Sequence, residues 1–292
     1  MRLLSSFCLL LLSPLTIWAD DPVNPLDKAP SRFVTHEGQK IHYKSIGEGK
    51  TALVFVHCWA GDMRFWKDQV PAFSGKLRLV LLDLPGHGQS DKPQREYTPE
   101  YFAQAVEAVL NEAGVEKAVL AGHSMGTPVI RQFYRRYPQQ VLGLVVVDGM
   151  LRRPPGKPED WAMWLKQFSG PDYENSVRKA VDGMMGPQSP AAVREWVKQV
   201  SPSCPQHVGV SALKNMMQGD IWQEDPITVP LQVLNAKSPH WPEDYVAYVR
   251  KLAPQVDYRT MDGVGHYLQL DQPDLFNRHL AEFLKKHGWV KE

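Results

Sequence analysis

The sequence predicts an α/β fold in which a mostly parallel sheet is covered by helices on both faces. Short, continuous apolar runs such as 51–56 and 142–147 are typical of strands buried on both faces of a sheet. Along the chain these runs alternate with segments in which apolar residues recur at helical spacing. The composition, 43% hydrophobic and 22% charged, is that of a globular protein and excludes a disordered chain.

The predicted elements follow one another in the order that such a fold requires. We expect strands at 51–56, 77–82, 118–121, 142–147, 231–234 and 256–260. We expect helices at 65–73, 99–114, 127–137, 243–252 and 273–286. The alternation breaks at residues 150–229, which contain no good strand. We expect only short helices there, near 161–164, 176–185, 191–200 and 213–217.

The first 19 residues have the composition of a secretory signal peptide. Arg2 precedes an apolar stretch that runs to Ala19 and stops before two aspartates. The stretch is shorter and more interrupted than the roughly 20 apolar residues that span a bilayer. We therefore expect cleavage near Ala19 and a secreted or periplasmic protein with no stable membrane anchor. A buried first helix is the alternative.

Charge and cysteine content exclude several classes of partner and cofactor. The chain has 33 Lys+Arg against 32 Asp+Glu, and its basic residues form no run longer than a pair. Nucleic-acid binding needs clustered basic residues, so we expect no nucleic-acid partner. No CxxC or HExxH motif is present, and we expect no metal ion and no cofactor. Whether Cys58 and Cys204 pair is left open, because pairing depends on geometry.

A GxSxG motif lies between a predicted strand and a predicted helix, at residues 122–126 (GHSMG). Its glycines let the backbone turn sharply with little side-chain bulk, which raises the Ser124 hydroxyl above the strand end at a helix N-terminus. The motif alone arises by chance in many chains. In this strand–turn–helix context it predicts that Ser124 is a nucleophile.

Further motifs follow other predicted strands: 56–61 (VHCWAG), 83–90 (DLPGHGQS) and Gly265-His266. Together with the GxSxG motif, and in this order, they resemble the α/β-hydrolase superfamily. The resemblance runs from about Phe33 to Leu284.

The resemblance implies the domain organisation of the chain. The α/β-hydrolase core is expected from residues 31–149 and 230–288. Residues 150–229 are expected to form a helical cap, or lid, inserted after the sixth strand. Within the 83–90 motif, Asp83 is expected to fix a loop and to take no part in catalysis.

The resemblance also implies a catalytic triad, in the chain order serine, acid, histidine. Ser124 would be the nucleophile and His266 the base that takes its proton as the hydroxyl attacks a carbonyl. Water would then release the acyl group. The backbone N–H groups of Met125 and Trp59 would bind the developing oxyanion.

The acid of the triad is the point at which the sequence departs from most of the superfamily. Most members carry it shortly after the strand predicted at 231–234, where this chain has no carboxylate. A minority carry it at the end of the preceding strand, where this chain has Asp148. We therefore expect Asp148 to orient His266, with Asp244 or Glu243 as alternatives.

A second departure concerns Cys58, which stands where many relatives have glycine. We expect Cys58 to adopt a backbone conformation that glycine tolerates more easily, and to be a buried small residue with no catalytic role.

The predicted cap is rich in methionine and tryptophan, which form adaptable apolar walls. We expect Met150, Trp161 and Trp164 to bind the substrate. The residues of these two types in the cap are Met150, Met163, Met184, Met185, Met216, Met217, Trp161, Trp164, Trp196 and Trp222.

The sequence thus favours a serine hydrolase that cleaves a carboxylic ester, or a related acyl bond, of an apolar small molecule. Haloalkane dehalogenases and epoxide hydrolases are disfavoured, because their nucleophile is an aspartate and this chain has Ser124 in its place. Two alternatives stay open. One is a ligand-binding or receptor-like protein that has lost turnover, and the other is a cofactor-free lyase or perhydrolase that uses the same triad.

Overall fold

The computed structural model describes residues 23–239 and 241–290. The predicted signal peptide, residues 1–19, lies outside the described residues. The described part contains an eight-stranded sheet. Its strands are β1 (Arg32–His36), β2 (Gln39–Ile46), β3 (Thr51–Val56), β4 (Arg78–Leu82), β5 (Lys117–His123), β6 (Val141–Val147), β7 (Leu231–Ala236) and β8 (Asp257–Met261).

The strand order is β1-β2-β4-β3-β5-β6-β7-β8. β1 pairs antiparallel with β2, and β2 pairs antiparallel with β4. All pairs from β4 to β8 are parallel, so the carboxyl ends of these strands meet at one edge of the sheet. The predicted α/β fold with a mostly parallel sheet is confirmed.

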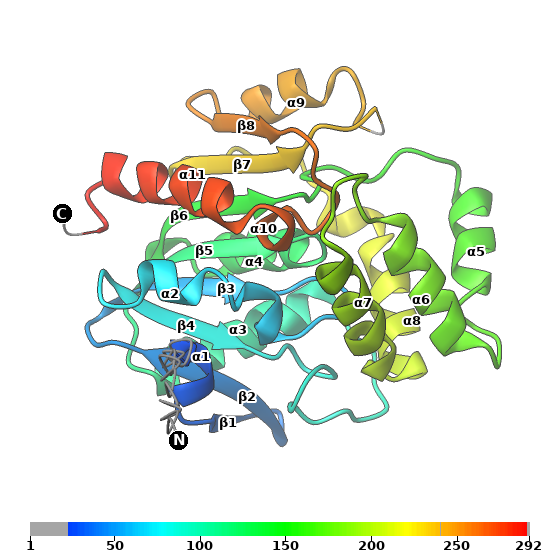
Figure 1. Ribbon diagram of the computed structural model, residues 1–292, viewed down its shortest axis with the longest axis horizontal. Coiled ribbons are helices and arrows are strands. Elements are labelled where there is room, and N and C mark those ends of the chain that lie inside the picture. Colours follow the sequence, from blue (N-terminus) through cyan, green and yellow to red (C-terminus); the bar gives the residue numbers. More distant parts are fainter. Residues whose placement is uncertain (1–22, 240, 291–292) are drawn as a thin grey trace, which may run out of the picture.

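Two groups of helices cover the two faces of the sheet (Figure 1). Alternate residues of β3 divide between them, since Leu53 and Phe55 join one buried cluster while Val54 and Val56 join the other. The first face is covered by α1 (Pro25–Lys28), α2 (Val70–Phe73), α10 (Leu268–Asp271) and α11 (Pro273–Lys286). The second is covered by α3 (Pro99–Glu112), α4 (Gly126–Arg136) and α9 (Tyr245–Leu252).

The prediction of a single helix at 65–73 is wrong. The structure has a 3-10 turn, Met63–Trp66, followed by the separate helix α2. Pro71 explains the break, because proline lacks an N–H and its ring clashes with the carbonyl four residues earlier in a continuous helix. The hairpin β1–β2 and the short helix α10 were not expected. Residues 32–46 contain no continuous apolar run that would predict a buried strand. In the structure only one stretch of β2 is buried, which is why the sequence there is mostly polar.

Four helices lie between β6 and β7, and we call residues 150–229 the insertion. They are α5 (Pro158–Lys166), α6 (Tyr173–Gly183), α7 (Ala191–Val200) and α8 (Gln206–Met216). Figure 1 shows them together at the carboxyl end of the parallel strands, on the right. That the insertion acts as a cap stays a prediction.

The exit of the insertion is fixed to α4, the helix that follows Ser124. The guanidinium of Arg135 donates to the carboxylate of Asp225 at 2.6 Å and to the carbonyl of Ile221 at 2.8 Å. Arg131 also pairs with Asp225, at 2.8 Å. Among the described residues, no helix is both long enough and apolar enough to cross a membrane.

Candidate active site

Ser124 occupies a sharp turn between β5 and α4. Its φ angle is +54°, in the left-handed region that a non-glycine residue adopts only at a cost in energy. The Ser124 N–H donates to the carbonyl of Val147 at 2.9 Å, and the Ser124 carbonyl accepts from the N–H of Thr127 at 2.9 Å. The surrounding backbone therefore holds the strained residue in place.

The two glycines of the GxSxG motif are required by close backbone approach. A Cβ atom on Gly122 would lie 2.4 Å from the carbonyl oxygen of Gly126. A Cβ atom on Gly126 would lie 2.5 Å from the carbonyl oxygen of Val56, at the end of β3. Any larger residue would force the turn open, so the start of α4 lies directly against the loop that follows β3.

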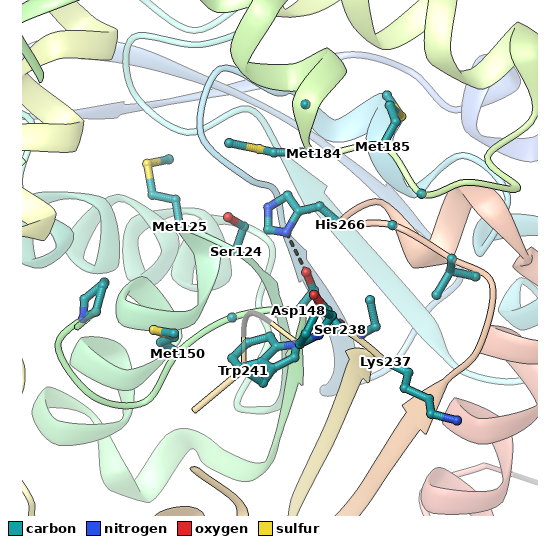
Figure 2. A pocket seen from close by; sticks show the side chains of 18 of the residues that line it. Ser124, Met125, Asp148, Met150, Met184, Met185, Lys237, Ser238, Trp241 and His266 are labelled. Carbon is teal, nitrogen blue, oxygen red and sulfur yellow. Dashed lines mark hydrogen bonds and ion pairs between the residues drawn. The ribbon is translucent and has the colours of Figure 1, made fainter. Parts of the chain in front are cut away.

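Asp148 follows β6 and accepts a hydrogen bond from the imidazole of His266. Its Oδ2 lies 2.6 Å from Nδ1 of His266, and its Oδ1 accepts from the N–H of Ala236 at 2.8 Å. A carboxylate only accepts hydrogen bonds, so Nδ1 carries the proton and the neutral ring keeps a lone pair on Nε2. Figure 2 shows the Ser124 hydroxyl beside this imidazole.

The alternative acids lie elsewhere. Asp244 forms a two-pronged ion pair with Arg152, at 2.6 and 2.7 Å, and both Asp244 and Glu243 are exposed. After β7, Lys237 pairs with Asp262 at 2.9 Å. The structure thus brings Asp148 to His266 and leaves Asp244 and Glu243 at the surface.

His123 supports the backbone of His266. Its Nε2 donates to the His266 carbonyl at 2.8 Å, and its Nδ1 accepts from the side-chain amide of Gln269 at 3.2 Å. Burial holds the pKa of His123 well below its usual value. His123 is therefore neutral, and it positions His266 without exchanging protons.

The two predicted oxyanion residues belong to the turn after β5 and to the loop after β3. Met125 lines the cavity above Ser124. Trp59 is buried in the loop after β3, and its indole N–H donates to the carbonyl of Gly209 in α8 at 2.9 Å. That contact joins the insertion to the loop that would bind the oxyanion.

A cavity of about 760 Å³ lies over Ser124, Asp148 and His266. Nine of its 24 lining residues are methionine or tryptophan, from the insertion and from the loops after β5 and β7. These residues are Met125, Met150, Met184, Met185, Met216, Met217, Trp161, Trp222 and Trp241.

Of the predicted substrate-binding residues, Met150 and Trp161 line this cavity, and Trp164 does not. Trp164 packs edge-on against Trp161 and Phe168 within the insertion. The methionine content of the insertion also signalled Met184, Met185, Met216 and Met217, which line the cavity. Trp241 lies beyond the insertion and gave no such signal.

Comparisons with known proteins support the fold. A family model described as the alpha/beta hydrolase fold matches residues 51–176, which carry Ser124 and Asp148. The chain has the α/β-hydrolase fold. The expected resemblance to that superfamily is thereby confirmed, and solved structures agree with it.

Two esterases illustrate the agreement. The chain superposes with a TM-score of 0.77 on a thermophilic esterase from Thermogutta terrifontis, at 24% identity over 89% of this chain and 99% of that one. It superposes with a TM-score of 0.76 on the esterase RhEst1 from Rhodococcus, at 23% identity over 88% and 99% of the two chains.

Sequence relatives carry other activities. The chain is 28% identical, over 82% of its length, to the dihydrolipoyllysine-residue acetyltransferase component of the acetoin cleaving system of Pseudomonas putida, and it spans 65% of that protein. It is 25% identical to epoxide hydrolase 4 of Mus musculus, over 87% of this chain and 78% of that protein. These different activities leave the reaction of this chain to be argued from its own residues.

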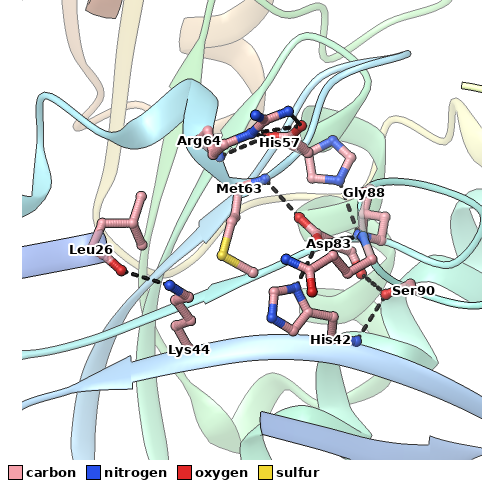
Figure 3. A network of polar contacts seen from close by, with 12 residues as sticks. Leu26, His42, Lys44, His57, Met63, Arg64, Asp83, Gly88 and Ser90 are labelled. Carbon is pink, nitrogen blue, oxygen red and sulfur yellow. Dashed lines mark hydrogen bonds and ion pairs between the residues drawn. The ribbon is translucent and has the colours of Figure 1, made fainter. Parts of the chain in front are cut away.

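Asp83 organises a second polar network, next to β4 (Figure 3). Its buried carboxylate accepts from the N–H groups of Met63 and Gln89 and lies 2.7 Å from Nδ1 of His42. Burial alone would raise the pKa of Asp83, but these hydrogen bonds outweigh it and hold the pKa below its usual value. A Cβ on Gly88 would lie 2.2 Å from this carboxylate. Asp83 therefore fixes the loop, as its sequence context predicted.

Both described cysteines are buried free thiols. Burial raises the pKa of Cys58 above its usual range and that of Cys204 to about 12, so both stay protonated. The expected glycine-like backbone at Cys58 is wrong, because the positive φ in this loop, +53°, belongs to Ala60. Within the described ranges, no group of three or more His, Cys, Asp or Glu side chains could hold a metal ion.

Proposed function

We propose that this α/β hydrolase cleaves a carboxylic ester, or a related acyl bond, of an apolar small molecule through an acyl-enzyme on Ser124. The observation that carries the proposal is the 2.6 Å contact between Asp148 and His266, beside a serine held at a φ angle of +54°. A nucleophile, a base and a group that orients the base are thereby collected in one cavity.

The proposed reaction uses these residues in turn. Nε2 of His266 takes the Ser124 proton as Oγ bonds to the carbonyl carbon, and the imidazolium then gives that proton to the leaving alcohol. Asp148 stays ionised and stabilises the imidazolium. Water, deprotonated by His266, attacks the acyl-enzyme and releases the acid and free Ser124.

The N–H groups of Met125 and Trp59 are proposed to bind the oxyanion. The close approach of Gly126 to the end of β3 supports this assignment, since it brings the two loops together. Loss of one such donor typically costs about 3–4 kcal/mol of transition-state stabilisation.

The cavity wall supports an apolar substrate. Methionine side chains adapt their shape to different apolar groups, and tryptophans add large contact areas. A volume of about 760 Å³ is in the range of pockets that enclose drug-sized molecules. Of the charged groups in the wall, Asp148 is engaged by His266 and Lys237 by Asp262.

Epoxide hydrolysis is the second candidate, because epoxide hydrolases occur among the sequence relatives. Such enzymes form an ester with an aspartate, and Ser124 stands at the nucleophile position of this chain. An alkoxide released from an epoxide would also need an electrophilic partner in the cavity. Ester cleavage therefore fits these residues better.

A fluorophosphonate probe tests the proposal. We expect the folded wild-type protein to be labelled, and Ser124→Ala to remain folded and take up no label. Ser90→Ala is a matched control, because Ser90 is a buried serine of the Asp83 network away from the cavity. A folded wild type that takes up no label would reject the proposal and favour a ligand-binding protein.

Export is proposed on the sequence of residues 1–19 alone. N-terminal sequencing of the protein recovered outside the cytoplasm should begin just after Ala19. Recovery only of chains that start at Met1 would reject export.

A further inference from the structure

The loop that carries His266 lies against the insertion, at the connection between α6 and α7, residues 184–189. The N–H of His266 donates to the carbonyl of Met184 at 2.9 Å. The two backbones approach closely, since a Cβ on Gly265 would lie 2.1 Å from the nitrogen of Gly186. The insertion therefore contacts His266 directly, at the backbone N–H of that residue.

Asp271 and Ser189 join the same two segments through side chains. Oδ2 of Asp271 accepts from the N–H of Gly265 at 2.7 Å and from the hydroxyl of Ser189 at 2.7 Å. The Ser189 hydroxyl in turn accepts from the N–H of Gly186 at 2.9 Å. Asp271 is only 8% exposed, so these bonds are largely shielded from water. The sequence pattern predicts a helix that begins at 273, two residues after Asp271, and marks neither Asp271 nor Ser189 as functional.

We infer that Ser189 and Asp271 are positioning residues for His266, and that the 184–189 connection sets the place of the base; this rests on the proposed function of His266. Asp148 orients the imidazole ring of His266, but the position of that ring also depends on the position of the His266 backbone. The loop contains Gly263 and Gly265, which leave its backbone many conformations. Anchors outside the loop are therefore needed to fix it.

The same connection also faces the substrate. Met184 and Met185 line the cavity, as Figure 2 shows, while the Met184 carbonyl holds the His266 peptide. A change in how the connection packs thus moves the base as well as the wall. A displacement of about 1 Å in a catalytic group can cost roughly 100-fold in rate.

Replacing the Ser189 hydroxyl tests the inference. For Ser189→Ala we expect kcat on a soluble ester to fall about 10- to 100-fold with KM changed less than about twofold. Ser189→Thr keeps the hydroxyl and should restore kcat to within about threefold of wild type. Ser203→Ala is the control, because Ser203 is also in the insertion but donates only to the carbonyl of Val200.

Three results would overturn the inference: an unchanged kcat in folded Ser189→Ala, a change confined to KM, or a loss of kcat that Ser189→Thr does not restore. The last result would mean that the site tolerates no change and that the hydroxyl has no specific role. Thermal unfolding of all three variants shows whether each is folded.

A second readout does not depend on turnover. The proton shared by His266 Nδ1 and Asp148 should give a downfield proton NMR resonance. We expect Ser189→Ala to shift or broaden it and Ser203→Ala to leave it in place. If wild type neither hydrolyses esters nor takes up the probe, the proposed function fails, and an unmoved resonance in Ser189→Ala would separately reject the positioning role.

Discussion

The cavity is built from two regions that hold their side chains in different ways. The core supplies Ser124, Asp148 and His266, each fixed by strained backbone or by hydrogen bonds of 2.6–2.9 Å to neighbouring strand ends. The insertion supplies mainly methionine and tryptophan, and of these Met184, Met185 and Met216 pack against the apolar core. Met163, on α5, is even 70% exposed.

This difference between the core and the insertion assigns the chemical step to the core and the choice of substrate to the insertion. Groups that move protons need fixed geometry, which directional hydrogen bonds provide. Groups that enclose an apolar substrate need area and adaptability, which methionine provides. Changes in the core should therefore affect the chemical step, and changes in the insertion wall should affect which substrate is preferred. The connection 184–189 is where the two regions meet.

The largest effect is expected at Asp148. Asp148→Asn keeps the shape of the side chain but can no longer stabilise the imidazolium, and its amide group favours the wrong tautomer of His266. We expect kcat on a soluble ester to fall roughly 10⁴-fold. Steady-state kinetics with an ester panel would measure it.

Asp244→Asn is the matched control. Asp244 is exposed and pairs with Arg152, so its replacement should change kcat less than about twofold. A large loss in Asp244→Asn together with an active Asp148→Asn would assign the acid to Asp244 and would contradict the role of Asp148 in orienting His266.

A smaller and selective effect is expected in the wall. Met216→Ala removes apolar contact from the cavity, which we expect to lower kcat/KM about 10-fold for long or aromatic acyl esters and much less for acetyl esters. Met163 is an exposed methionine of the same insertion, so Met163→Ala should leave kcat/KM unchanged for both kinds of ester. An equal loss on every ester would show that Met216 acts on the chemical step.

Stability, unlike activity, is expected to depend on pH through three buried histidines of the core. Burial lowers the pKa of His57, of His87 to about 3, and of His123 well below its usual 6.5. The unfolded chain takes up these protons near pH 6.5 and the folded chain does not. The free energy of unfolding should therefore fall as pH drops below about 6.5, by ~1.4 kcal/mol per pH unit for each such histidine.

Urea unfolding at pH 7.5 and pH 5.5 would measure this dependence. Asp83 adds a separate loss in more acidic solution, because hydrogen bonds hold its pKa below 3.8 and protonation breaks them. A stability that stays constant or rises between pH 7.5 and pH 5.5 would contradict the neutral state of the buried histidines.

The sequence predicted what depends on local pattern. Ser124 lies in a motif whose glycines are dictated by backbone contacts within a few residues, and His266 follows a strand. Asp148 was expected from the resemblance, because a minority of the superfamily carries the acid at that strand end and the end of β7 has no carboxylate. The structure shows the consequence, since β7 instead donates the N–H of Ala236 to Asp148.

Long-range packing could not be predicted. Trp164 packs against Phe168 and does not line the cavity, and helical spacing does not predict which neighbour a tryptophan contacts. The bond between Ser189 and Asp271 joins residues 82 positions apart. The positive φ at Ala60 instead of Cys58 depends on the whole path of the loop after β3.

The most direct test of the central claim is mass spectrometry of the protein quenched during turnover of a slowly hydrolysed ester. We expect the acyl group on the peptide that contains Ser124, and no adduct in Ser124→Ala. Turnover with the adduct on Asp148, on Cys58 or on any other residue would contradict the account.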